Sequence, residues 1–147
     1  MRSILPDHPR VVWMPGGLRL EVHLDSAATG GAFCLLVDHP PAGWSLPPHR
    51  HRNEAEIVHV VEGAFEMRVN GTPVRLDLGQ TLMVPRGATH SGANVGDRLG
   101  RRVVIFSPAG LEEFFLEAGA PAPDAPIDVE GAVRSAARHG WEFVEGA

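Results

Sequence analysis

Polar and apolar residues alternate along several short stretches of the chain, most clearly in residues 18–24, LRLEVHL. Leucine or valine stands at every second position there, with arginine, glutamate and histidine between, which is the period of a strand with one buried face. The Asn70-Gly71 pair is a strong hairpin signal. Further strands separated by Gly and Pro are expected at 33–37, 56–61, 65–69, 72–76, 81–84, 88–94 and 99–106. Many short strands, with no helical pattern before residue 108, predict an all-β sandwich or barrel.

The pattern changes after Ser107, which is positioned to cap a helix whose first residue is a proline. Residues 108–118 place their apolar side chains on one helical face. A linker at 119–126 is rich in Pro and Ala, and a second, weaker helix is expected over 128–138. We expect these two helices to cover an open end or a flank of the barrel.

Composition and charge exclude several classes of protein. The 147 residues suit one domain, and 44% of them are hydrophobic, enough for a real core. The 13 arginines are scattered among 18 acids, with a net charge of −5, so no nucleic-acid partner is expected. No stretch resembles a signal peptide or is long enough to span a bilayer, so we expect a cytoplasmic protein with no membrane partner. The single cysteine, Cys34, excludes an intramolecular disulfide.

The chain contains no lysine and no tyrosine. Schiff-base chemistry on a lysine and acid–base chemistry on a tyrosine are therefore excluded. Proton transfer must fall to His, Asp, Glu, the cysteine or a metal-bound water.

Four residues form a candidate metal site: His49, His51, Glu56 and His90. His49 and His51 are two apart, so on a strand both side chains point to the same face. Taken singly, histidines are usually structural, and the surrounding sequence is what favours ligation here. Three imidazoles and one carboxylate suit a divalent transition metal, namely Fe, Mn, Co, Ni, Cu or Zn.

Two motifs surround these residues. Residues 43–63 read GWSLPPHRHRNEAEIVHVVEG, and residues 79–94 read GQTLMVPRGATHSGAN, with 15 residues between them. Their glycine, proline, histidine and glutamate spacings resemble the two motifs of the cupin superfamily, of the single-domain type. The resemblance implies a double-stranded β-helix (jelly-roll) barrel with one metal ion inside, bound by His49, His51, Glu56 and His90. It also implies one cupin domain over 1–147, with N-terminal strands at 1–30, the barrel core at 31–107 and a helical tail at 108–147.

Among cupins, the chain most resembles the short quercetin-dioxygenase-like group, including the segment SPAGLEEFF at 107–115. The resemblance implies an oxidoreductase that adds dioxygen to an enolic or aromatic hydroxy-ketone, with Glu56 as the catalytic base. A non-catalytic module that binds a small molecule through the metal, and a metal-dependent isomerase or hydrolytic enzyme, remain alternatives. Cupins often pair, and a homodimer is expected through the edges of strands at 11–14 and 18–24.

The remaining polar residues receive simpler roles. His23 and His59 are expected on the surface, and Glu54 fits the glycine spacing less well than Glu56. Either Arg101 or Arg102 is expected to point inward as an anion handle. The pocket is expected to be apolar and lined by one face of each of two strands, comprising Phe33, Leu35, Val37, Phe65, Met67 and Val69, with Cys34 facing away from it.

Overall fold

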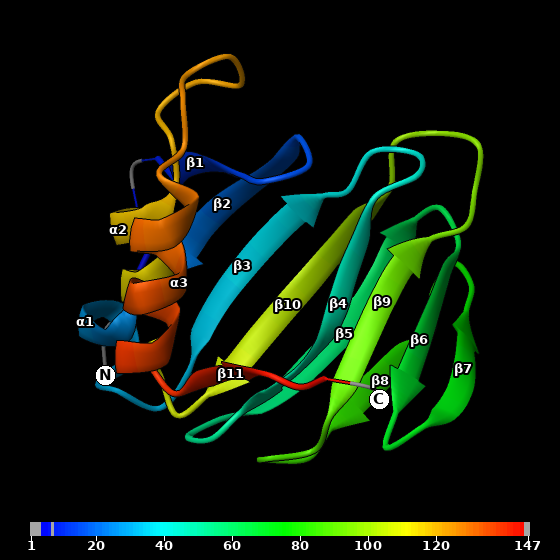
Figure 1. Cartoon of the computed structure of the whole chain (residues 1–147). Coiled ribbons are helices and arrows are strands. Elements are labelled where there is room, and N and C mark those ends of the chain that lie inside the picture. Colours follow the sequence, from blue (N-terminus) through cyan, green and yellow to red (C-terminus); the bar gives the residue numbers. More distant parts are fainter. Residues whose placement is uncertain (1–3, 7, 146–147) are drawn as a thin grey trace.

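The computed structural model describes residues 4–6 and 8–145, and its strands form two antiparallel sheets that face each other (Figure 1). The six-stranded sheet has the order β1 (Arg10–Met14), β2 (Leu18–Leu24), β3 (Cys34–His39), β10 (Arg101–Ser107), β5 (Ala55–Glu62) and β8 (Thr81–Val84). The five-stranded sheet has the order β11 (Trp141–Phe143), β4 (Ser45–His51), β9 (His90–Asn94), β6 (Phe65–Val69) and β7 (Thr72–Leu76). This is the all-β jelly-roll fold that the sequence predicted. The predicted division at residues 30/31 and 107/108 stays a prediction.

The clearest sequence signals correspond to real elements. Strand β2 has the predicted bounds, and its alternation buries Leu18, Leu20 and Val22. The hairpin β6–β7 turns at Asn70-Gly71, where the backbone φ angles are +49° and +83°. Both angles are positive, as a type I′ turn requires, and Asn and Gly tolerate them best.

Strand β4 was absent from the predicted strands because its sequence contains Pro47 and Pro48. Proline cannot donate to a strand ladder and is confined to edges and bulges. In the structure the register between β4 and β9 shifts between Leu46 and His49, so the two prolines fall where the ladder is irregular. After the shift, His49 pairs with His90.

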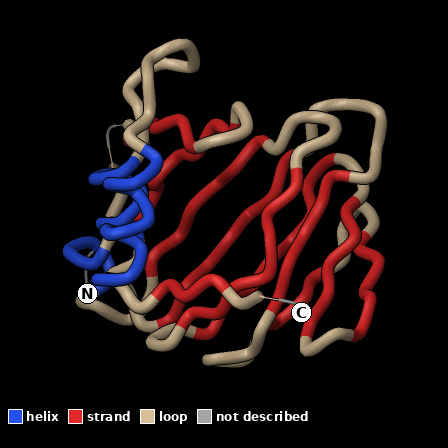
Figure 2. The backbone as a smooth tube through the Cα atoms, in the orientation of Figure 1, coloured by secondary structure: helices blue, strands red, loops and turns tan. Residues whose placement is uncertain are grey.

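The C-terminal region begins with two helices, α2 (Glu112–Ala118) and α3 (Val129–Arg138), which lie together at one side of the sheets (Figure 2). Helix α2 starts four residues later than predicted. Ser107 does not cap it, because its hydroxyl donates to the carbonyl oxygen of Ala32. Strand β11 follows α3 and was not predicted. It extends the five-stranded sheet beside β4.

The expected phase of β3 was wrong. Cys34, Leu36 and Asp38 share the inward face, and Cys34 and Leu36 are 0% and 1% exposed. Leu35 and Val37 therefore point to the outer side of the sheet. A short helix, α1 (Ser26–Thr29), connects β2 to this strand. Within the described residues, no helix is long and apolar enough to cross a membrane.

Candidate metal centre

Strand β4 presents His49 and His51 on one face, as the two-residue spacing predicted. Strand β9 runs antiparallel beside it and places His90 directly opposite His49 in the register. Glu56, near the start of β5, approaches from the other sheet. The four residues are all buried, with exposures between 2% and 7%.

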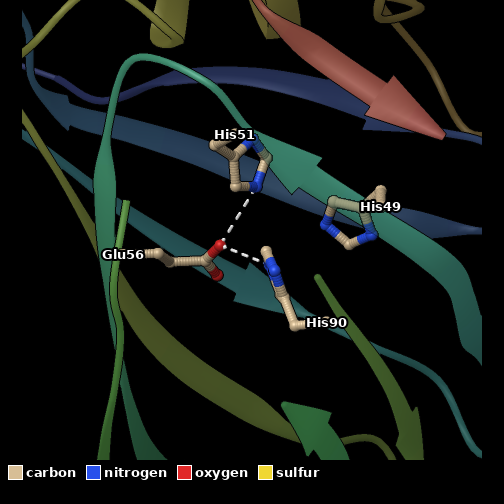
Figure 3. A group of neighbouring side chains, drawn as sticks. All are labelled: His49, His51, Glu56 and His90. Carbon is tan, nitrogen blue, oxygen red and sulfur yellow. Dashed lines mark hydrogen bonds and ion pairs between the residues drawn. The ribbon is translucent and has the colours of Figure 1, made fainter. Parts of the chain in front are cut away.

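The four side chains converge on one point (Figure 3). Each offers one ligand atom, and these atoms lie within 4.8 Å of one another. Glu56 Oε1 lies 3.2 Å from His51 Nε2 and 3.1 Å from His90 Nε2. The structure therefore brings together all four residues singled out from the sequence, in a group that can hold a metal ion.

The outer nitrogens of two imidazoles support this arrangement. His49 Nδ1 lies 2.8 Å from the carbonyl oxygen of Pro47, and His90 Nδ1 lies 3.0 Å from that of Ala88. A carbonyl oxygen accepts a hydrogen bond, so both Nδ1 atoms donate, and in the neutral form of each ring Nε2 has a lone pair for a metal. His51 differs, because its Nδ1 is enclosed without a hydrogen-bond partner among the described residues.

Electrostatics also favour a cation at this point. Burial lowers the pKa of His49 to about 3, with a contribution from His90, so this ring is neutral and ready to coordinate. Burial alone would raise the pKa of Glu56, but hydrogen bonds from His51 and His90 hold it below its usual value. Burial alone would lower the pKa of His90, yet Glu56 raises it. An ionised carboxylate thus stands among imidazoles, where a cation would compensate its charge.

The metal-site residues line a cavity of about 320 Å³ whose walls are mostly apolar, as expected. Aromatic rings surround the histidines: Trp141 stacks on His49 at a centroid distance of 4.7 Å, and Phe106 meets His51 edge-on at 5.1 Å. Met67 lines the cavity as predicted, but Phe65 and Val69 do not. Strand β3 contributes Leu36 and Asp38 in place of Leu35 and Val37, and Phe33 does not line the cavity either. Cys34, on the inward face, is not among the lining residues.

Sequence reasoning missed the C-terminal part of this cavity. Val129 and Val133 of α3, and Trp141 and Phe143 of β11, all contribute to its wall. The signal present in the sequence was the aromatic pair around Glu142, just after Gly140. A three-residue strand is too short to show an alternation.

Other candidates lie outside the metal-site group. His23 contacts Glu21 at 2.9 Å, and His59 contacts Thr81 at 2.8 Å, both away from the cavity. Glu54 is buried, with Oε2 unpartnered among the described residues, and burial raises its pKa to about 7. It is not one of the four residues that converge. Of the two adjacent arginines, Arg102 lines the cavity and Arg101 is exposed.

Several proteins of Streptomyces are similar to this chain. "Polyketide synthase CurC" of Streptomyces cyaneus is 33% identical over 70% of this chain and 66% of its own length. "Tetracenomycin polyketide synthase protein TcmJ" of Streptomyces glaucescens is 31% identical over 74% of this chain and 69% of its own length. The chain therefore spans about two thirds of the length of these relatives.

More distant similarities extend the comparison. Quercetin 2,3-dioxygenase of Bacillus subtilis is 28% identical over 63% of this chain, but over only 27% of its own length. The solved structure of KdgF from Halomonas sp. superposes with a TM-score of 0.66 at 20% identity, covering 77% of this chain and 99% of that one, which shows the shared fold alone. The cupin domain family matches residues 35–106, a segment that contains all four converging residues. The chain belongs to the cupin family.

Proposed function

We propose that this protein is a metal-dependent cupin dioxygenase of the quercetinase-like kind, acting on an enolic or aromatic hydroxy-ketone. The observation that carries the proposal is the meeting of His49, His51, Glu56 and His90 in the wall of an apolar cavity. The three histidines and Glu56 would hold the ion. When bound, a divalent redox-active metal supplies Lewis-acid and oxygen chemistry at this wall.

Glu56 is the residue best placed to move a proton. The acids that line the cavity within the described residues are Asp38 and Glu56, and Asp38 is bonded to Arg102. The chain has no lysine or tyrosine to serve instead. Glu56 Oε1 would accept the proton of the substrate's enol or hydroxyl group, and the surrounding imidazoles favour its ionised form.

The cavity walls contribute by excluding water and orienting the ring system. Trp141 and Phe106 present aromatic surface next to the imidazoles, and Phe115 packs against both of them in the cavity wall. A flat substrate packed between them keeps its reacting carbon and oxygen beside Glu56. Low water content also strengthens the hydrogen bonds that hold an enolate in place.

The similarity to two proteins named as polyketide synthase components favours a second candidate. A polyketide carries β-dicarbonyl groups, which enolise readily and suit the same base. The reaction would then be a proton transfer without oxygen, as in an isomerase. A third possibility is a module that binds such a molecule through the metal without turnover.

Oxygen consumption separates these candidates. Protein loaded in turn with Fe, Mn, Co, Ni, Cu and Zn is incubated with flavonols and β-dicarbonyl compounds, in air and under nitrogen. Oxygen uptake matched to product supports the dioxygenase, and product formed under nitrogen supports the isomerase. If the protein binds these compounds but forms no product with any of the six metals, the binding module becomes the preferred function.

Glu56→Gln tests the assigned base, because it keeps the shape and one oxygen donor but removes the basic carboxylate. We expect most of the metal to remain and turnover to fall by the roughly 10²–10⁴-fold that general base catalysis supplies. Glu54→Gln is the matched control, since Glu54 is also a buried glutamate but lies outside the converging group. Equal turnover in wild type and Glu56→Gln would eliminate Glu56 as the base.

A further inference from the structure

A second polar group lies in the same cavity. Asp38 of β3 and Arg102 of β10 face each other in the register of the six-stranded sheet, and both point inward. Arg102 Nε donates to Asp38 Oδ1 at 3.0 Å, and Nη2 donates to Oδ2 at 2.7 Å. The two residues are 4% and 5% exposed. Among the described residues, this bidentate ion pair is the charged group that lines the cavity besides the metal site.

Aromatic rings hold the guanidinium in one position. Its central carbon lies 4.9 Å from the centroid of Trp44 and 5.0 Å from that of Phe65. A guanidinium fixed by two rings and a bidentate carboxylate has little freedom left to lose when it binds a further group. Arg102 is therefore a preorganised donor.

One nitrogen of this guanidinium makes no hydrogen bond within the described residues. Nε and Nη2 are committed to Asp38, whereas Nη1 has no hydrogen-bond partner among the described residues. Some side-chain atoms of the described residues are fully enclosed and lack a partner, but Nη1 is not among them. It is therefore not sealed inside the protein. Because Arg102 lines the cavity, Nη1 is available to a molecule inside it.

The pair belongs to the same space as the metal site. Burial alone would lower the pKa of Arg102, but Asp38 raises it above its usual value, with a smaller contribution from Glu56. Glu56, Asp38 and Arg102 all line this one cavity. A single ligand in this cavity can contact both centres.

The negative charge of Asp38 determines which kind of oxygen acceptor binds best at Nη1. Asp38 already neutralises Arg102, so a carboxylate placed at Nη1 would meet the negative charge of Asp38 behind it. A neutral oxygen acceptor meets no such repulsion and still gains a hydrogen bond from a charged donor. Since an apolar cavity of about 150 Å³ holds benzene, the larger cavity here has room for two or three fused rings.

We propose that Nη1 of Arg102 binds a neutral carbonyl oxygen of an aromatic substrate whose opposite end carries the hydroxyl group that reaches the metal centre. This assigns Arg102 as the residue that selects the substrate and sets its orientation. The assignment of the second end rests on the proposed function of the metal centre. The substrate class is a fused-ring phenol with a ketone at the far end.

Three probes that differ at one position test this assignment: 2-naphthol, 6-acetyl-2-naphthol and 6-hydroxy-2-naphthoate. Their dissociation constants are measured by tryptophan fluorescence, since Trp44 and Trp141 line the cavity. The protein is loaded with Zn²⁺, which has no redox chemistry, so binding is observed without oxygenation. We expect the acetyl probe to bind at least about tenfold more tightly than 2-naphthol, and more tightly than the carboxylate probe.

A double variant removes the donor without leaving a buried charge unpaired. Asp38→Leu/Arg102→Met replaces the whole ion pair by apolar groups, a change that proteins often tolerate. It should erase the acetyl preference while 2-naphthol still binds. Asp38→Asn should shift the preference toward the carboxylate probe, because the guanidinium is then no longer neutralised. Arg101→Met, at the exposed neighbouring position, should retain the wild-type order.

Several results would overturn the proposal. These are an acetyl preference that survives in the double variant, a wild-type protein that prefers the carboxylate, and a wild-type protein that binds none of the probes. Failure of the proposed dioxygenase function is a separate outcome. It appears as absent oxygen uptake with redox-active metals, and it leaves the order of affinities of the Zn²⁺ protein unchanged.

Discussion

His49 and His90 lie opposite each other on adjacent strands. Replacing either histidine by alanine removes one ligand from the metal site. Changes to groups that merely support a ligand typically lower metal affinity about 10–100-fold, and loss of the ligand itself should cost at least as much. We therefore expect His49→Ala and His90→Ala to remain folded and to lose most of their metal, measured by elemental analysis after dialysis. His59→Ala is the control, because His59 binds Thr81 outside the cavity. Unchanged metal content in both variants would show that the ion is bound elsewhere.

The pH dependence of metal affinity depends on which imidazole holds a proton. His49, with a pKa of about 3, does not compete with the metal near neutral pH. His90 does compete, because Glu56 raises its pKa despite burial. A protonated His90 must lose its proton before it can coordinate, so affinity should be constant above this raised pKa and fall about tenfold per pH unit below it.

Competition with a chelator at a series of pH values measures this profile. In Glu56→Gln the cause of the raised pKa is removed, so the fall in affinity should begin at lower pH than in wild type. Affinity that increases with acid would be incompatible with histidine ligation.

At the scale of elements, β11 places the C-terminal region in contact with the metal site. Trp141 pairs with His51 in the register, stacks on His49 and is 8% exposed. Trp141→Ala should lower the free energy of unfolding by about 3–5 kcal/mol, as large-to-small core changes do. Trp141→Phe should cost far less, because it keeps the ring and removes an Nε1 donor that has no partner among the described residues.

Urea denaturation measures these differences. Phe143→Ala serves as the control, since Phe143 is 49% exposed and its truncation forfeits less buried area. A loss at Trp141 no larger than at Phe143 would show that β11 contributes little to the stability of the barrel.

Sequence patterns predicted the elements whose structure depends on interactions between residues close together in the chain. Strand β2 and the Asn70-Gly71 hairpin follow from alternation and turn chemistry, which act over a few residues. Strand β4 was missed because its prolines look incompatible with a ladder until the bulge beside β9 is known. The phase of β3 was reversed because residues on both of its faces are apolar, so alternation could not identify the inner one. The bonded pair of Asp38 and Arg102 joins residues 64 positions apart, a proximity that no local pattern reveals.

At the scale of the whole molecule, the outer face of the six-stranded sheet carries a continuous apolar row. Ile105 pairs with Leu35 on one side and with Ile57 on the other, and Ile57 pairs with Met83. These side chains point away from the cavity, since their neighbours Leu36, Val58 and Val104 are buried inside. Met83 is 61% exposed, and Leu35, Ile57 and Ile105 are half-buried. Monomeric proteins rarely leave a large contiguous apolar patch in water.

We propose that a second copy of the chain covers this row, giving the expected homodimer by a route other than strand edges. The edge strand β1 is partly occupied, because Trp13 and Ala120 exchange backbone hydrogen bonds at 2.8 Å. Ile57→Glu/Met83→Glu should convert a dimer to a monomer in light scattering, since two charges would be desolvated in each half of the interface. Leu78→Glu, at a position that is 68% exposed and outside the row, should remain dimeric. A wild-type monomer over a wide concentration range would refute the homodimer. If the Ile57→Glu/Met83→Glu variant remained dimeric, the contact would lie at the free edge of β1 or elsewhere on the surface.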